Sequence, residues 1–264
     1  MRHEPIMTRR GSAAILLLAL SGCTVAEPGA TGTAGAPAAA LEPVVIDALR
    51  QMGATLMAAR SFGVRIHVQR NGVLPDGQQV TLLSTTALAM QRPDRLVALV
   101  GSDRGNFRLS YDGRTVSLVD LTSNSYGQGA FSGSVEALLA ALERQFDIDL
   151  PVRDLLAPDP YAALVEPGTT GVMVGQTVVG GVICDHFALR SGETDWEIWL
   201  EADGRRLPRM LATVDRSLAE RPRVVLTFED WTLEPRLPPG VFSTRRPPGA
   251  TDIVLPTEST GAAR

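Results

Sequence analysis

The chain has 264 residues, of which 44% are hydrophobic and 20% are charged, a composition typical of a globular protein with an apolar core. All 25 basic residues are arginines, and with 29 acidic residues the formal net charge is −4. An acidic chain with 5% aromatic residues lacks the basic surface and stacking side chains of nucleic-acid-binding proteins. Its two cysteines exclude a framework of several disulfides.

The amino terminus has the form of a secretory signal. An arginine pair precedes an apolar run over residues 13–20, which is too short to span a bilayer. The run ends in Leu20-Ser21-Gly22-Cys23, which resembles the lipobox of bacterial lipoproteins. The resemblance implies cleavage before Cys23 and acylation of that cysteine. We expect residues 1–22 to be a signal peptide and Cys23 to anchor the protein; an ordinary signal peptide is the alternative.

The next residues indicate where the protein resides. Thr24 follows the expected lipidation site, and by resemblance to proteobacterial sorting rules a residue other than Asp favours the periplasmic face of the outer membrane. The arginine pair also resembles a twin-arginine signal, although the apolar residues expected directly after it are missing. Residues 23–41 are mostly small, which is typical of a flexible tether.

A folded domain is expected over residues 42–254. Apolar residues at helical spacing predict an amphipathic helix over 43–56, with Pro43 in its first turn. Alternation over 62–70 predicts a strand with one dry and one wet face. Asn71-Gly72 and Asp76-Gly77 are expected to form the turn that follows. Further strands are expected over 78–90, 96–101, 107–111, 115–121 and 126–131.

The second half predicts helices and then more strands. Ser134 is expected to cap a helix whose apolar stripe runs to Phe146, and a short helical fragment is expected over 152–156. Strands follow over 170–179, 182–190, 196–202, 207–215 and 223–233. Residues 255–264 are expected to form a disordered tail.

Short connections force antiparallel neighbours, because a parallel partner needs a crossover of about a dozen residues or more. The sequence therefore predicts a mainly β fold with helices (α+β). Its strongly curved antiparallel sheet, or unclosed barrel, has about eleven strands and carries helices on the concave face. A two-sheet sandwich is the alternative.

Several motifs together resemble one family. They are Arg92-Pro93-Asp94-Arg95-Leu96, Tyr111-Asp112-Gly113-Arg114-Thr115, a late cluster over 184–209, and Pro247-Pro248-Gly249-Ala250. Over residues 43–253 the chain resembles bacterial predicted periplasmic proteins of domain of unknown function 2092, and more distantly the LolA and LolB lipoprotein carriers. In the carriers, an unclosed barrel beneath helices holds acyl chains. The resemblance implies this fold and an apolar ligand, but carries over no functional residue.

The concave face of such a sheet offers an apolar site that needs few polar groups. Side chains two apart on a strand share a face. Two strands supply the expected ligand-binding residues: Val64, Ile66 and Val68, and Trp196, Ile198 and Leu200. We expect them to line a cavity for an acyl chain, a lipid or a lipoprotein. Alternatively, they pack beneath the helices of an envelope protein that has a filled core and a protein partner.

No motif indicates catalysis, and we expect no enzyme activity, cofactor, metal or nucleic-acid partner. Asp185 and His186 are strand neighbours and point to opposite faces. Cys184 and His186 share a face, but two ligands do not make a stable zinc site, so we expect a buried thiol beside a hydrogen-bonded histidine. His67 is expected on the wet face. A serine-hydrolase elbow, a phosphate-binding glycine loop and a His-Glu-x-x-His pattern are absent.

Two surface features are expected from the sequence. Five arginines are expected to form a solvated rim, or else to bind anionic headgroups or an acidic partner: Arg205, Arg206, Arg209, Arg221 and Arg223. Val73-Leu74-Pro75 places apolar residues in an expected turn. They either touch a membrane or ligand, or fold back onto the sheet.

Overall fold

The computed structural model describes residues 40–146 and 152–255. The expected signal peptide, Cys23, most of the expected tether and the tail from residue 256 lie outside these residues. In the part of the chain that is described, no helix combines the length and the apolar character needed to cross a membrane.

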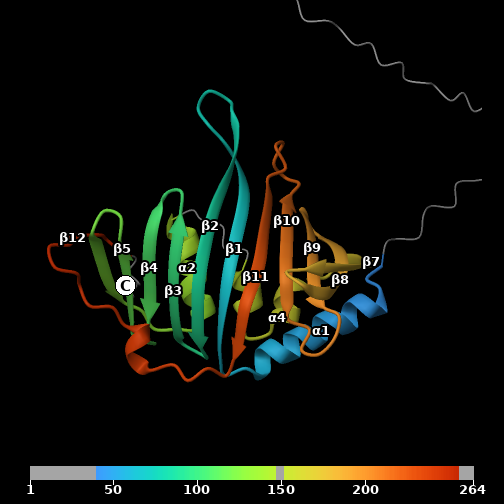
Figure 1. Cartoon of the computed structure of the whole chain (residues 1–264), viewed down its shortest axis with the longest axis horizontal. Coiled ribbons are helices and arrows are strands. Elements are labelled where there is room, and N and C mark those ends of the chain that lie inside the picture. Colours follow the sequence, from blue (N-terminus) through green and yellow to red (C-terminus); the bar gives the residue numbers. More distant parts are fainter. Residues whose placement is uncertain (1–39, 147–151, 256–264) are drawn as a thin grey trace, which may run out of the picture. The chain divides into compact units, whose positions relative to one another are not determined.

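One sheet contains all twelve strands of the described residues, in the order β12-β6-β5-β4-β3-β2-β1-β11-β10-β9-β8-β7 (Figure 1). The strands are β1 (Ser61–Val73), β2 (Gln79–Gln91), β3 (Arg95–Ser102), β4 (Gly105–Tyr111), β5 (Thr115–Asp120), β6 (Ser125–Ala130), β7 (Thr170–Val179), β8 (Val182–Ser191), β9 (Thr194–Glu201), β10 (Pro208–Asp215), β11 (Arg223–Leu233) and β12 (Thr251–Asp252). The helices are α1 (Pro43–Ala58), α2 (Val135–Phe146), α3 (Arg153–Leu156), α4 (Pro160–Leu164) and the 3₁₀ helix η1 (Pro239–Phe242). Neighbouring strands are antiparallel except β12, which pairs with β6 in parallel.

The predicted fold is confirmed, as a single sheet rather than a sandwich. α4, η1 and β12 were not predicted. The prediction of a turn at Asn71-Gly72 is wrong, because Asn71 pairs with Thr81 and Gly72 pairs with Val80. The ladder between two thirteen-residue strands extends past this pair, and the chain turns only after Val73.

The four α-helices cover one face of the sheet, here called the inner face (Figure 1). Strand residues of this face and residues of all four α-helices form one core cluster. Its largest helical contribution comes from α1 and α2: Val45, Leu49, Met52 and Leu56, and Val135, Leu138, Leu139 and Leu142. Antiparallel pairing aligns the inner side chains across strands, with Val64 opposite Leu88 and Ile66 opposite Phe228. Burial of this apolar layer is the main stabilising contribution to the domain.

One half-buried arginine connects two helices to the sheet. The guanidinium of Arg92, beside the end of β2, donates to the carbonyl oxygens of Leu56, Leu156 and Ala157 at 3.4, 3.3 and 3.2 Å. These carbonyls lie at the carboxyl ends of α1 and α3, where helical partners are missing and a positive charge is favourable. Burial lowers the pKa of Arg92. Arg92 therefore connects the helices to each other and to the sheet.

Two segments cover parts of the opposite, outer face. The η1 segment buries Phe242, and Arg108 of β4 donates to Thr244 and to the carbonyl of Val241, both at 2.9 Å. At the other end of the sheet, Cys184, Trp199 and Ala212 form a small cluster against which Val179 and Val182 pack. The turn between β7 and β8 therefore lies over the outer face of the neighbouring strands.

Candidate functional site

The expected ligand-binding residues of β1 and β9 all lie on the inner face. Val64, Ile66, Trp196, Ile198 and Leu200 are at most 5% exposed and belong to the core cluster, and Val68 is half-buried against it. Helical side chains fill the space above them. Their contact with a ligand stays a prediction, because a ligand can reach them only if a helix moves.

The inner layer offers an acyl chain an apolar environment. Its buried side chains are mostly apolar. The hydroxyl of Tyr111 donates to the carbonyl of Gly133 at 2.8 Å, and the indole of Trp196 donates to the hydroxyl of Ser191 at 3.1 Å. Asp185, a carboxylate that is 6% exposed, accepts from Gln176 at 2.8 Å and pairs with Arg206. The polar groups of these three side chains therefore already have partners within the chain.

The sheet opens on one side of this layer because β10 and β11 separate. Their pairing extends only from Met210–Thr227 to Val214–Arg223. Beyond Thr227, β11 continues along β1 through a bulge in which Asp230 has a φ of 53°. β10 continues along β9 through a second irregularity between Pro208 and Met210. Two bulges on adjacent strands bend the strands apart.

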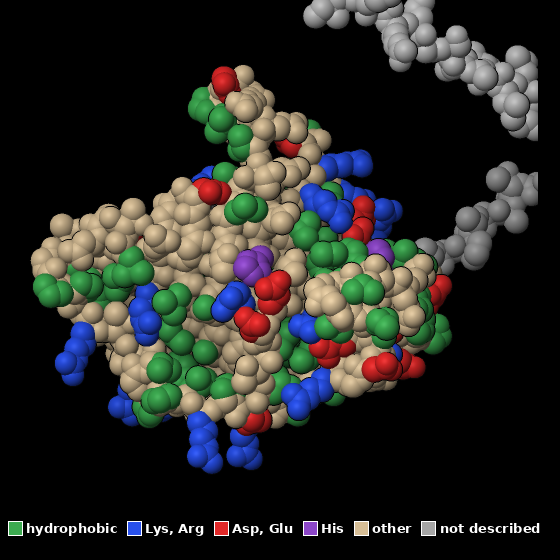
Figure 2. All heavy atoms as spheres, viewed as in Figure 1, with side chains coloured by type: hydrophobic (Ala, Val, Ile, Leu, Met, Phe, Trp, Pro, Cys, Tyr) green, Lys and Arg blue, Asp and Glu red, His purple; other side chains and the backbone are tan. Residues whose placement is uncertain are grey.

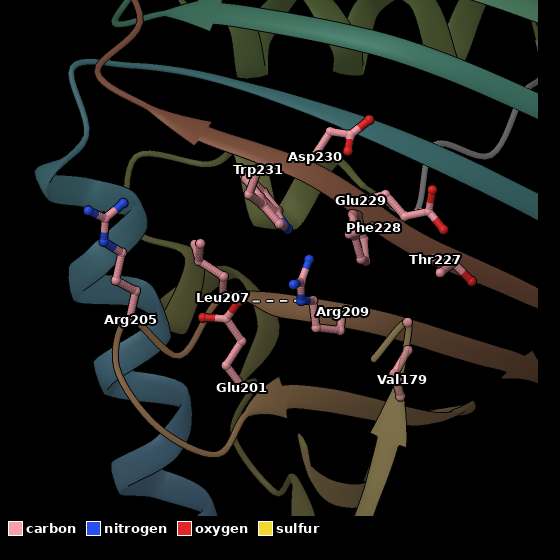
Figure 3. A pocket seen from close by; sticks show the side chains of 11 residues that line it. Val179, Glu201, Arg205, Leu207, Arg209, Thr227, Phe228, Glu229, Asp230 and Trp231 are labelled. Carbon is pink, nitrogen blue, oxygen red and sulfur yellow. Dashed lines mark ion pairs between the residues drawn. The ribbon is translucent and has the colours of Figure 1, made fainter. Parts of the chain in front are cut away.

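A cleft of about 510 Å³ lies at this separation (Figure 3). Its lining residues are Val179, Gly180, Glu201, Arg205, Leu207, Arg209, Thr227, Phe228, Glu229, Asp230 and Trp231. Phe228 and Leu207 also belong to the core cluster, and Trp231 packs against it. The indole of Trp231 donates to the carbonyl of Pro208 at 2.9 Å. The cleft therefore ends against side chains of the apolar core, of which Phe228 and Leu207 are 1% and 5% exposed.

Arg209 is the cation at the centre of the cleft. Its Nε lies 3.3 Å from Glu201 Oε1, and the two side chains are 20% and 18% exposed. This Nε is buried and has no hydrogen-bond partner in the described part of the chain. The carboxylates of Glu229 and Asp230 point away from Arg209 (Figure 3) and pair with His67 and Arg65. A guanidinium has five N–H donors, so Arg209 can hold an anionic head while keeping Glu201.

The predicted solvated rim is wrong for two of its arginines. The side chains of Arg206 and Arg209 are each only 20% exposed, in ion pairs with Asp185 and Glu201. Arg223, with a side chain 44% exposed beside Glu197, fits the rim. Arg206 has a φ of 56° and Arg209 lies within the irregularity of β10, between Pro208 and Met210, so neither side chain follows strand alternation.

The structure places the cysteine and the two histidines that the sequence singled out. Cys184 is buried as predicted, and burial raises its pKa. The expected hydrogen bond of His186 is wrong: its ring stacks on Trp199 at 4.0 Å, and its buried Nε2 has no hydrogen-bond partner among the described residues. His67 lies on the outer face as predicted, with 39% of its side chain exposed. Residues 40–146 and 152–255 contain no cluster of three potential metal ligands.

The β1–β2 hairpin extends beyond the rest of the sheet (Figure 1). Val73, Leu74 and Leu83 are 65%, 43% and 53% exposed. Figure 2 shows apolar side chains at this protruding end. Val73 and Leu74 therefore do not fold back onto the sheet, and their contact with a membrane or a ligand stays a prediction.

Three comparisons relate the chain to known proteins. A family model described as predicted periplasmic protein (DUF2092) matches residues 46–255. The search of curated proteins finds no match. Among solved structures, lipoprotein LppX from Mycobacterium tuberculosis is 14% identical, with 74% of this chain and 98% of that chain covered and a TM-score of 0.41. LprF from Mycobacterium bovis is 11% identical, with 75% and 97% covered and a TM-score of 0.44. A LolA superfamily protein from Nitrosomonas europaea is 10% identical, with 75% and 97% covered and a TM-score of 0.37.

Proposed function

This chain belongs to the DUF2092 family of predicted periplasmic proteins, and we propose that it binds a hydrophobic ligand with an anionic head in the periplasm. The ligand carries an acyl chain, as a fatty acid, a lipid or a lipoprotein does. Binding is non-covalent, and no bond is made or broken. The acyl chain lies between the sheet and the helices against six side chains: Val64, Ile66, Val68, Trp196, Ile198 and Leu200.

The observation that carries this proposal is the continuity between the cleft and the core. Phe228 and Leu207 line the cleft and are also core residues. A molecule that enters between β10 and β11 therefore meets Arg209 with its head and the apolar layer with its tail. The volume of about 510 Å³ lies within the range of about 300–1,000 Å³ typical of small-molecule sites.

The helix α1 is the element that makes room. Protein interiors are close-packed, so an acyl chain enters only where protein side chains leave. The side chains of Val45, Leu49, Met52 and Leu56 are fully buried beneath α1, and they belong to the same apolar cluster as the proposed ligand contacts. Near its carboxyl end, Thr55 donates to the carbonyl of Arg205 at 2.7 Å. Because Arg205 lines the cleft, the end of α1 adjoins the proposed entrance.

A protein partner is the second candidate, and the filled inner layer favours it. If α1 does not move, the core residues stabilise a fold whose exposed surfaces bind another envelope protein. A fixed core predicts that the protein neither retains lipid during purification nor binds a fatty-acid probe. The binding experiment below distinguishes the two candidates.

We also propose that Cys23 anchors the protein at the periplasmic face of the outer membrane. The support is the motif Leu20-Ser21-Gly22-Cys23 and the Thr24 that follows it. More than one acyl chain is needed to hold a protein stably at a membrane, which lipobox processing supplies. Replacing Cys23 with Ala is expected to move the protein from the membrane fraction to the soluble fraction. Unchanged membrane association would contradict the anchor.

The binding proposal is tested with the full chain carrying Cys23→Ser and a fluorescent fatty acid. Loss of a hydrogen bond to a charged group costs about 1.5–3 kcal/mol, so Arg209→Gln is expected to weaken binding by tenfold or more. Arg223→Gln removes an arginine that is not among the residues lining the cleft between β10 and β11 and is the matched control. Absence of probe binding to the protein with Arg209 intact would refute the function. Equal effects of the two substitutions would refute the role of the cleft.

A further inference from the structure

The ion pair in the cleft leaves most of its hydrogen-bonding capacity unused. Within the described residues, the carboxylate of Glu201 accepts no hydrogen bond, and its one ion pair is the contact of 3.3 Å with Arg209 Nε. The guanidinium of Arg209 donates no hydrogen bond to these residues either. A carboxylate has about four acceptor positions and a guanidinium has five N–H donors. A ligand can therefore bind both groups at once, with an acceptor for Arg209 and a donor for Glu201.

The backbone holds the carboxylate of this pair in place. Glu201 is the last residue of β9. Its N–H donates to the carbonyl of Leu207 at 3.1 Å, and its carbonyl accepts from the guanidinium of Arg206, also at 3.1 Å. Figure 3 shows the side chains of Glu201 and Arg209 pointing toward each other in the cleft. Because both are only about one-fifth exposed, their unused donors and acceptors favour a ligand that satisfies them.

The other charged side chains of the cleft are directed elsewhere. Glu229 and Asp230 pair with cations of β1. Arg205 is exposed, and its guanidinium points away from the ion pair (Figure 3). A ligand head therefore meets one cation and one anion side by side, with no net charge. A head that carries only negative charge would place a second anion beside Glu201, where like charges repel.

We propose that the ligand of this cleft is a phospholipid whose head carries both a phosphate and a primary ammonium group, as phosphoethanolamine does. The phosphate accepts hydrogen bonds from Arg209 and the ammonium donates to Glu201, so each charge of the head meets an opposite charge. The inference rests on the proposed function, because the acyl chain of this lipid lies against the inner layer. Arg209 alone would bind any anion, so Glu201 is the residue that selects the head.

Displacement of a fluorescent fatty acid from the full chain carrying Cys23→Ser tests the head group. The competitors are lysophospholipids with the same acyl chain, each used below its critical micelle concentration. Lysophosphatidylethanolamine is expected to displace the probe at a concentration at least tenfold lower than lysophosphatidic acid, which lacks the ammonium. Lysophosphatidylcholine, whose ammonium has no N–H donor, is expected to lose most of this advantage. Phosphoethanolamine without an acyl chain is expected not to displace the probe, because it makes no contact with the apolar layer.

A substitution of Glu201 tests which residue selects the head. Glu201→Gln removes the negative charge and keeps the size of the side chain, so it is expected to abolish the preference for lysophosphatidylethanolamine while the probe still binds. Glu197→Gln is the matched control. Glu197 lies on the same strand and pairs with Arg223 at 2.7 Å, but it is not among the residues that line the cleft. The preference is expected to persist in this control.

The outcomes separate this inference from the proposed function. Equal displacement by lysophosphatidylethanolamine and lysophosphatidic acid, with the probe bound, would overturn the head-group preference and leave acyl-chain binding in place. This comparison needs no substitution in the cleft, so it does not depend on the folding of a variant. A preference that survives Glu201→Gln would overturn the role of Glu201, and displacement by phosphoethanolamine alone would overturn the lipid. Failure of the probe to bind would refute the proposed function and this inference with it.

Discussion

A reversible link between α1 and α4 tests the proposed movement of α1. A Cβ atom placed on Gly53 of α1 would lie 3.3 Å from the Cβ of Tyr161 in α4. Natural disulfides join Cβ atoms about 3.5–4.5 Å apart, so Gly53→Cys with Tyr161→Cys needs only a small adjustment. With Cys23→Ser in the same chain, the remaining cysteine is Cys184, which is buried.

The expected effect follows from the side chains that α1 buries. Val45, Leu49, Met52 and Leu56 are 0% exposed, and exposing each costs about 1.5–3 kcal/mol, or about 6–12 kcal/mol together. Burial of an acyl chain of about 14 methylene groups contributes about 11 kcal/mol of favourable free energy, at about 0.8 kcal/mol for each group. The exchange is nearly balanced, so binding is sensitive to any restraint on α1. We expect the disulfide to weaken binding of a fatty acid by tenfold or more, which corresponds to about 1.4 kcal/mol.

The assay compares one protein in two states. A fluorescent fatty acid is titrated into the oxidised variant and again after reduction, so that the composition of the chain is identical in both titrations. Thermal unfolding reports on formation of the link, since a disulfide closing a loop of about 100 residues stabilises by up to about 4.7 kcal/mol in the chain-entropy account. Equal affinities of the oxidised and reduced forms for the fatty acid would refute the proposal that α1 moves away from α4 when the ligand binds.

Three further predictions concern single residues. Arg92→Met removes the donor to the ends of α1 and α3; it is expected to lower the unfolding free energy by about 2–4 kcal/mol in denaturant titrations, and an unchanged midpoint would contradict the role of Arg92. Burial is the main cause that lowers the pKa of His186, so the folded state favours the neutral ring. The unfolding free energy is therefore expected to fall as the pH drops below about 6.5, and His186→Phe is expected to reduce this fall. Identical pH profiles of the variant and the unmodified chain would contradict the role of His186. Leu74→Ser at the exposed hairpin tip is expected to reduce binding to lipid vesicles in a flotation assay while Leu121→Ser does not; equal flotation of both variants removes the tip from membrane contact.

The sequence predicted the sheet and its faces well because alternation is a local property. Val64 and Ile66 face the core and His67 faces outward, as period-two spacing requires, and burial in the structure follows that pattern. The apolar stripe of α1 was predicted for the same reason, because the spacing of three and four residues that defines a helix face is also a local pattern. Strand β12 has only two residues, too few for any periodic signal.

The cleft could not be predicted because it depends on relations between strands. β10 and β11 separate where their shared hydrogen-bond ladder ends. The alternation of residues along one strand does not show which residues of the neighbouring strand it pairs with, so the sequence could not show where this ladder ends. Arg206 has a positive φ and Arg209 lies within an irregularity of β10, so strand alternation did not predict where these two side chains point. A Gly or an Asn at such a position would have suggested a positive φ, but an arginine gives no such signal.

Contacts between an acyl chain and the inner-face methyl groups would test the central claim most directly. The isoleucine methyl groups are suitable reporters, because Ile66 and Ile198 are 2% and 0% exposed on the inner face whereas Ile183 is 59% exposed near the sheet edge. In the methyl-labelled full chain carrying Cys23→Ser with a saturating fatty acid, the proposal predicts nuclear Overhauser contacts from acyl methylenes to Ile66 and Ile198. Contacts confined to Ile183, or none at all, would show that the inner layer stays closed and would contradict ligand binding there.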